Sequence, residues 1–152
     1  MCTSFMGQLM TATHNFGVAP TRAGTGVDTF KAALYLTTAT VNASTTAYSA
    51  SNEVSGTGYS AGGVAVTMGT VPTATNSSAT AGVAFVTPSA SITYTTVTLS
   101  TAFDAVLIYN STQADKAVSV HTFGSQTITA GTFTLTMPSN TTTTALIRLA
   151  TT

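Results

Sequence analysis

The chain has 152 residues, the length of one ordinary domain, and 43% of them are hydrophobic, which predicts a folded core rather than a disordered chain. Only 5% are charged, against about a quarter in a typical globular chain. Four basic residues balance four acidic ones, and this neutrality excludes the electrostatic footprint of a protein that binds nucleic acid or an anionic membrane.

Residues 1–25 come first and stand apart, because they are rich in Met and then in Gly and Thr. Residues 1–10 lack the basic start and the continuous apolar run of a signal peptide, and no stretch of the chain approaches the roughly 20 apolar residues of a membrane span. Cys2 is the only cysteine, so no intramolecular disulfide can form. We interpret the segment as an N-terminal arm or a first strand that packs back on its own domain or latches onto a neighbouring subunit.

The first clear strand pattern covers residues 30–36, where apolar side chains alternate along the chain. Residues 37–63 follow and are rich in Ser, Thr, Asn and Gly, which predicts a long ordered loop anchored by its few large side chains, such as Tyr48 and Tyr59.

Further alternating runs occupy residues 64–68, 83–85, 92–99, 103–109, 117–123, 126–129, 132–137 and 143–149. The run 92–99 changes phase near Thr95 and Thr96, which indicates a bulge. The polar residues 110–116 are suited to closing a hairpin, and residues 73–81 to a polar turn.

With no convincing helix and an abundance of β-branched Thr, the pattern predicts an all-β domain over residues 26–152: a single jelly-roll-like β-sandwich of about eight short antiparallel strands. Few charged side chains protect its strand edges, so we expect neighbours in an assembly to cover some of them.

Catalytic patterns are absent from the sequence. His14 and His121 lie in no recognisable motif, and the four acidic residues do not pair along the chain, although a fold could bring two together. The stretch GTGYSAGG at residues 56–63 lacks the Lys-Ser/Thr of a phosphate-binding loop. We therefore predict a protein that is not an enzyme, with no catalytic, cofactor-binding or metal-binding residues.

Several strings occur in an order that resembles a known family. They are THNF at 13–16, the run from DTFKAALYL to SAGG at 28–63, DAVLIYNST at 104–112, HTFGSQTITAGTFTLTMP at 121–138 and ALIRLA at 145–150. Over nearly the whole chain these resemble small structural proteins of tailed bacteriophages, in particular capsid cement or decoration proteins. The resemblance implies a jelly-roll domain whose arms clamp adjacent major capsid subunits, and it transfers no catalytic residues.

The resulting hypothesis is a virion structural protein that stabilises the phage head by binding major capsid subunits, or another virion protein, and itself as a dimer or trimer. It would be made in the cytoplasm of the host bacterium and reside on the capsid surface, without contacting nucleic acid or membrane. The expected contacts are aromatic, Met and Leu side chains of the arm and long loop, which are common interface anchors: Phe5, Met6, Leu9, Met10, Phe16, Tyr48 and Tyr59.

Two alternatives remain open at this point. A tail or fibre-associated protein would share the β-rich composition but occur in few copies per particle. A carbohydrate-binding module on the particle surface would need an aromatic platform, for which Tyr35, Tyr94 and Tyr109 are the candidates.

Overall fold

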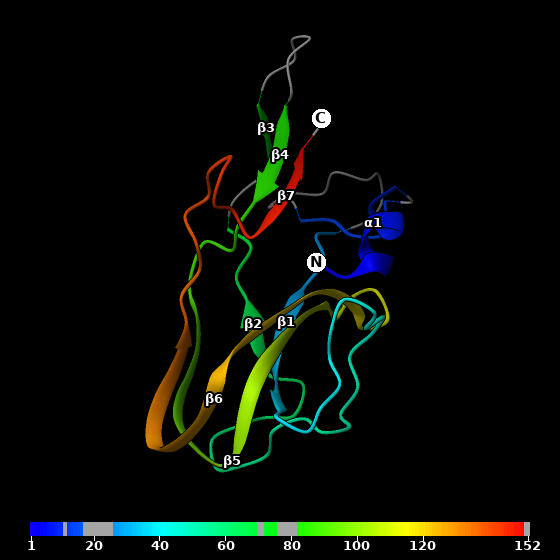
Figure 1. Cartoon of the computed structure of the whole chain (residues 1–152). Coiled ribbons are helices and arrows are strands. Elements are labelled where there is room, and N and C mark those ends of the chain that lie inside the picture. The colour runs from blue at the N-terminus through cyan, green and yellow to red at the C-terminus, as the bar shows by residue number, and fades with distance from the viewer. Residues whose placement is uncertain (11, 17–25, 70–71, 76–81, 151–152) are drawn as a thin grey trace.

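The computed structural model describes residues 1–10, 12–16, 26–69, 72–75 and 82–150 (Figure 1). Within them the chain forms two antiparallel sheets and one short helix, which confirms the predicted all-β fold. The four-stranded sheet has the order β2 (Val64–Val66), β1 (Phe30–Leu36), β5 (Ile92–Asn110) and β6 (Lys116–Leu135). The three-stranded sheet has the order β3 (Thr73–Thr75), β4 (Val83–Val86) and β7 (Ile147–Ala150) and stands at one end of the molecule (Figure 1).

The expectation of no helix was wrong at the N-terminus, where α1 spans Thr3–Met10. Phe5 and Leu9 are four residues apart and therefore share one face of this helix. Phe5 is fully buried and Leu9 is partly buried against the core. Burial of this apolar face favours a helix here although the segment is too short to be a stable helix alone.

The strand count also differs from the prediction, because several expected short strands are continuous. The runs 92–99 and 103–109 form one strand, β5, of 19 residues, and the runs between 117 and 135 form one strand, β6, of 20 residues. The two strands pair as a hairpin across the polar connection at 110–116, as predicted. The bulge near Thr96 is confirmed by a register shift between Tyr94 and Val97 and by a φ of 54° at Thr96.

The long hairpin curls, so that aromatic side chains from its two halves meet. The ring of Phe133, near the end of β6, lies 5.2 Å from the ring of Phe103 and 5.2 Å from that of Phe123. On the same half of the hairpin, the Tyr94 hydroxyl donates a 2.7 Å hydrogen bond to the carbonyl of Ala32 in β1. The half of β5 around Phe103 to Asn110 pairs with β1, and the half around Tyr94 folds over β1. The hydrophobic core lies between these two halves.

The polar turn expected at residues 73–81 is partly a strand, because Thr73–Thr75 pairs with β4 as β3. Residues 76–81 lie outside the described residues. No helix in the described part of the chain has the length and the apolar character needed to cross a membrane.

Gly63, at the end of the long loop, lies close against the backbone of β1. Its φ is +72°, and a Cβ at this position would lie 1.6 Å from the carbonyl oxygen of Ala32. We predict that Gly63→Ala lowers the free energy of unfolding by more than about 2 kcal/mol, because backbone must move to admit the methyl group. Gly124→Ala is the matched control, because nothing lies within 4 Å of its added Cβ. Chemical denaturation of both variants tests this, and equal effects would contradict it.

Candidate interaction surface

The described part of the N-terminal segment, residues 1–10 and 12–16, packs on its own domain, which is one of the two arrangements that the sequence left open. The amide of Cys2 donates to the carbonyl of Val118 in β6, and the amide of Thr3 donates to the carbonyl of Ala43 in the long loop, both at 2.9 Å. Cys2 is fully buried, and this burial raises the pKa of its thiol. The thiol is therefore protonated and inaccessible, which is the opposite of a reactive cysteine.

An aromatic ladder joins this segment to β1. The ring of Phe5 lies 4.8 Å from that of His14, His14 lies 5.9 Å from Phe16, and Phe16 stacks on Phe30 at 4.6 Å with an interplanar angle of 10°. The ladder buries Phe16 against the first residue of β1 and so aligns the segment with the sheet.

A buried carboxylate, that of Asp28, links the same segment to the end of β5. Asp28 accepts hydrogen bonds from the backbone amide of Asn15 at 2.7 Å, from Asn110 Nδ2 at 2.8 Å and from Gln113 Nε2 at 3.1 Å. Asn110 is fully buried at the end of β5, and its Oδ1 accepts from the amides of Thr112 and Gln113. Burying this charge is tolerated because several donors compensate for the lost water.

The protonation of His14 follows from the same network. Asn110 Nδ2 lies 3.0 Å from His14 Nδ1 and can only donate, so Nδ1 accepts. The proton then sits on Nε2, which donates to Gln8 Oε1 at 2.8 Å. His14 is thus a neutral structural link between α1 and the β5–β6 turn, with both ring nitrogens engaged.

A second carboxylate, Glu53, anchors the long loop. Its Oε2 accepts from the hydroxyl of Tyr48 at 2.6 Å, and its Oε1 accepts from the hydroxyl of Tyr59 at 2.7 Å and from the amide of Gly62 at 2.8 Å. The Tyr59 hydroxyl in turn accepts from the amide of Leu34 in β1 at 2.9 Å. Residues 37–63 are therefore held on the sheet by charge-assisted hydrogen bonds, in spite of their loop composition.

The other three tyrosines are buried with exposed fractions of 1–2%, and their hydroxyls donate to backbone carbonyls. Tyr35 donates to Ser49, Tyr94 to Ala32, and Tyr109 to Gly62. The idea that these three rings form an exposed platform for a sugar is therefore wrong. The sequence does not reveal the burial of Tyr94 and Tyr109, because their partners Ala32 and Gly62 lie far away along the chain.

The expected contact residues lie in varied surroundings. Phe5 and Phe16 are buried in the chain's own core, while Tyr48 and Tyr59 are half-buried with their hydroxyls bound to Glu53. The side chains of Met6 and Met10 lie outside the described residues, although both positions belong to α1. A role for these seven residues in contacts between subunits stays a prediction.

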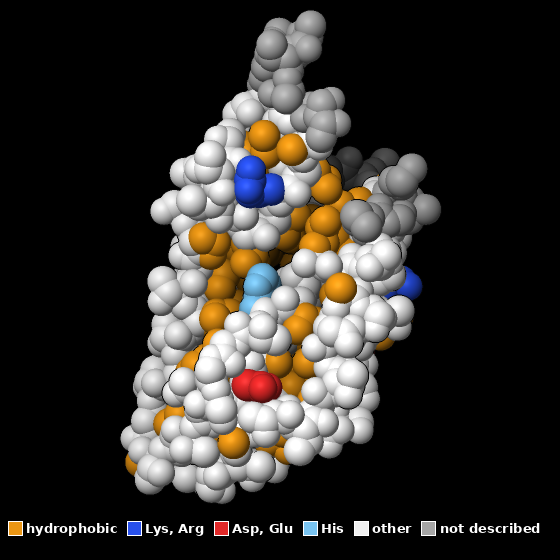
Figure 2. Space-filling view, in the orientation of Figure 1, with side chains coloured by type: hydrophobic (Ala, Val, Ile, Leu, Met, Phe, Trp, Pro, Cys, Tyr) orange, Lys and Arg blue, Asp and Glu red, His pale blue; other side chains and the backbone are white. Residues whose placement is uncertain are grey.

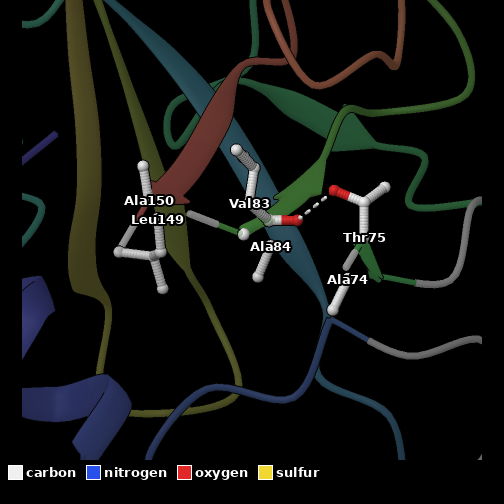
Figure 3. Close-up of a pocket in the computed structure, with 7 residues that line it drawn as sticks. Ala74, Thr75, Val83, Ala84, Leu149 and Ala150 are labelled. Atoms are coloured by element: carbon white, nitrogen blue, oxygen red, sulfur yellow. Dashed lines mark hydrogen bonds between the residues drawn. The ribbon is translucent and has the colours of Figure 1, made fainter. Parts of the chain in front are cut away.

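A surface that the sequence analysis missed lies on the three-stranded sheet. Ala74, Ala84 and Leu149 are register neighbours across β3, β4 and β7, and their side chains point to the same side of the sheet (Figure 3). They border an open depression of about 310 Å³. Leu149 is 43% exposed, which is unusual for a large apolar side chain in this structure. The alternation in ALIRLA is the signal that could have pointed to it.

An almost wholly apolar groove continues from this depression toward the N-terminal segment. Ala84 and Leu149 border both hollows, and Leu9 and Phe16 close the far side of the groove, with further apolar side chains from β4 and β7. Figure 2 shows hydrophobic side chains exposed around the upper part of the molecule and in the hollow below it, with very few charged groups between them. Such a surface favours contact with another protein surface.

Catalytic chemistry finds little support in the described residues. Ser119 Oγ lies 2.9 Å from His121 Nε2, which is the separation of a nucleophile and its base. The serine is only 1% exposed, however, and burial lowers the pKa of His121. A substrate cannot reach this hydroxyl in the folded chain. Among the described residues, no three metal-binding side chains lie close enough to hold an ion.

No known protein family, curated protein or solved structure matches this chain.

Asn110 offers a test of the network that fastens the N-terminal segment. We predict that Asn110→Ala lowers the free energy of unfolding by about 2 to 4 kcal/mol, because Asp28 and His14 each lose a buried partner. Asn140→Ala is the control, because the side-chain oxygen of Asn140 has no hydrogen-bond partner. Urea denaturation of the two variants compares them, and a similar loss in both would count against the network.

The tyrosines predict how stability depends on pH. Burial raises the pKa of all five, that of Tyr109 to about 12, from an ordinary value of 10. A raised pKa in the folded state favours the protonated form, so stability is intact below pH 10 and falls as the pH rises through 12. We expect tyrosinate absorbance to appear in this window together with unfolding. In concentrated guanidinium chloride the tyrosine hydroxyls should titrate near pH 10. If those of the folded chain also titrated near pH 10, the raised pKa values would be refuted.

Proposed function

We propose that this chain is a virion structural protein of a tailed bacteriophage, most specifically a capsid cement or decoration protein that binds major capsid subunits and itself. The observation that carries the proposal is the apolar surface on the three-stranded sheet, centred on Leu149. Only 5% of the chain is charged, so electrostatic repulsion between molecules is weak and association is favoured. The strings at residues 28–63 and 121–138, which resemble phage structural proteins, support the same function.

Further support comes from how the irregular parts of the chain are held. Glu53 holds the long loop on the four-stranded sheet, and Asp28 holds the described part of the N-terminal segment there, so that these parts form one rigid block with the sheet. A rigid block loses little conformational entropy when it is fixed in a lattice. Many identical copies then stabilise a shell by burying apolar surface at about 25 cal/mol per Å².

We further propose that the two sheets form a distorted jelly-roll-like sandwich. The curl of β5 and β6 supports it, since a strand that turns over the core contributes to both of its sides. Long curled strands would replace the pairs of short strands in a regular jelly roll.

The experiment is to purify particles from cells that produce this chain and to count its copies against the major capsid protein by quantitative mass spectrometry. We expect hundreds of copies per particle and density on the outer head surface by cryo-electron microscopy. Particles lacking the chain should burst at lower temperature, and added purified chain should restore their stability. Absence from particles would refute the proposal, and a few copies at one vertex would favour a tail or fibre-associated protein.

A further inference from the structure

In the described part of the chain, the outer edge of β7 is open. β7 pairs with β4 on one side, and no other described strand or isolated bridge pairs with its second edge. Such an edge presents unpaired N–H and C=O groups, which are a template for another strand. Leu149, the most exposed large apolar residue of the sheet, lies in the same strand.

The usual protection of an open edge is weak here. β7 contains no proline, and its one charged residue is Arg148. Because side chains alternate along a strand, Arg148 points to the face opposite Leu149. Its Nε donates a 2.7 Å hydrogen bond to the carbonyl of Thr142, so the guanidinium is turned back onto its own chain.

We propose that β7 pairs antiparallel with β7 of a second copy of this chain, about a two-fold axis that passes at Leu149. This inference rests on the proposed function, because it names the partner of the Leu149 surface. Leu149 then lies opposite Leu149 of the partner subunit, and Arg148 lies opposite Ala150 of the partner subunit. The two three-stranded sheets become one sheet of six strands.

Self-complementarity is the reason to choose a second copy. An axis at Leu149 places apolar side chains against each other and keeps the two arginines apart, whereas an axis at Arg148 would set them directly opposite. The apolar face formed by Ala74, Ala84 and Leu149 continues across the axis without interruption. The face and edge carry no acidic group for a basic partner to recognise, while two-fold contacts between copies are the commonest in oligomers.

Four residues span only about 13 Å of strand, so one such contact is small and the dimer is weak in free solution. In a particle, each copy is also held by its other contacts, and the effective concentration of its neighbour is high. The pairing therefore acts as a link between copies that are already placed side by side.

The first experiment compares two apolar residues of similar exposure, Leu149 and Val27. Sedimentation velocity of the full chain over a range of concentrations should show a reversible dimer. Leu149→Lys should weaken it at least about tenfold by placing two like charges at the axis. Val27→Lys is the matched control, since Val27 is 39% exposed, and should leave the dimer unchanged. A chain that stays monomeric, or a dimer that both variants affect equally, would overturn the proposal.

The second experiment fixes the register. Residues directly opposite in antiparallel strands have Cα atoms about 4.5 to 5.5 Å apart, within the range of a disulfide. Leu149→Cys should therefore form covalent dimers under mild oxidation, while Ala150→Cys, whose two copies are offset along the strands, should do so much more slowly. Cys2 does not interfere because it is fully buried. Equal rates at the two positions would overturn the register and the two-fold axis.

These outcomes are separate from a failure of the proposed function. If the chain is abundant in particles but Leu149→Lys leaves self-association unchanged, the pairing is wrong and the function stands. If dimers form through Leu149 but no particle contains the chain, the pairing stands and the function is wrong.

Discussion

Two carboxylates hold the long loop and the described part of the N-terminal segment against the four-stranded sheet. Asp28 gathers the amide of Asn15 and the side chains of Asn110 and Gln113, and Glu53 gathers two tyrosine hydroxyls and the amide of Gly62. In a chain with only four acidic residues, two of them serve as internal acceptors. Each orders the groups around it, because a charge that accepts several hydrogen bonds fixes the position of its donors.

This arrangement has a consequence for the outside of the molecule. The carboxylates of Asp28 and Glu53 are engaged inside the fold and do not hydrate the surface, and only 5% of the chain is charged. The result is a stiff body whose apolar face at Leu149 is poorly suited to exposure in a free monomer. In a subunit of a fixed assembly such an apolar face is favourable, because a neighbouring subunit buries it permanently.

The N-terminal segment shows how far tertiary contacts can change an interpretation. Its apolar residues, Phe5 and Phe16 among them, look like contacts for a neighbour when they are read along the chain. In the fold they fill a gap beside Phe30, in a ladder that includes His14. Sequence alone cannot distinguish the two outcomes, because an apolar side chain gains the same free energy from burial within its own chain as from burial against another.

Local patterns were sufficient for much of the fold. Alternation placed β1 at residues 30–36, the phase change at Thr96 marked a bulge, and residues 110–116 closed the central hairpin. These features depend on neighbours in sequence, so the amino acids by themselves determined them. The length and curl of β5 and β6, the burial of Tyr94 beneath the loop, and the open edge at Leu149 depend on residues tens of positions apart. Only the tertiary structure decided these, because long-range packing and hydrogen bonding select one arrangement among many that the same local preferences allow.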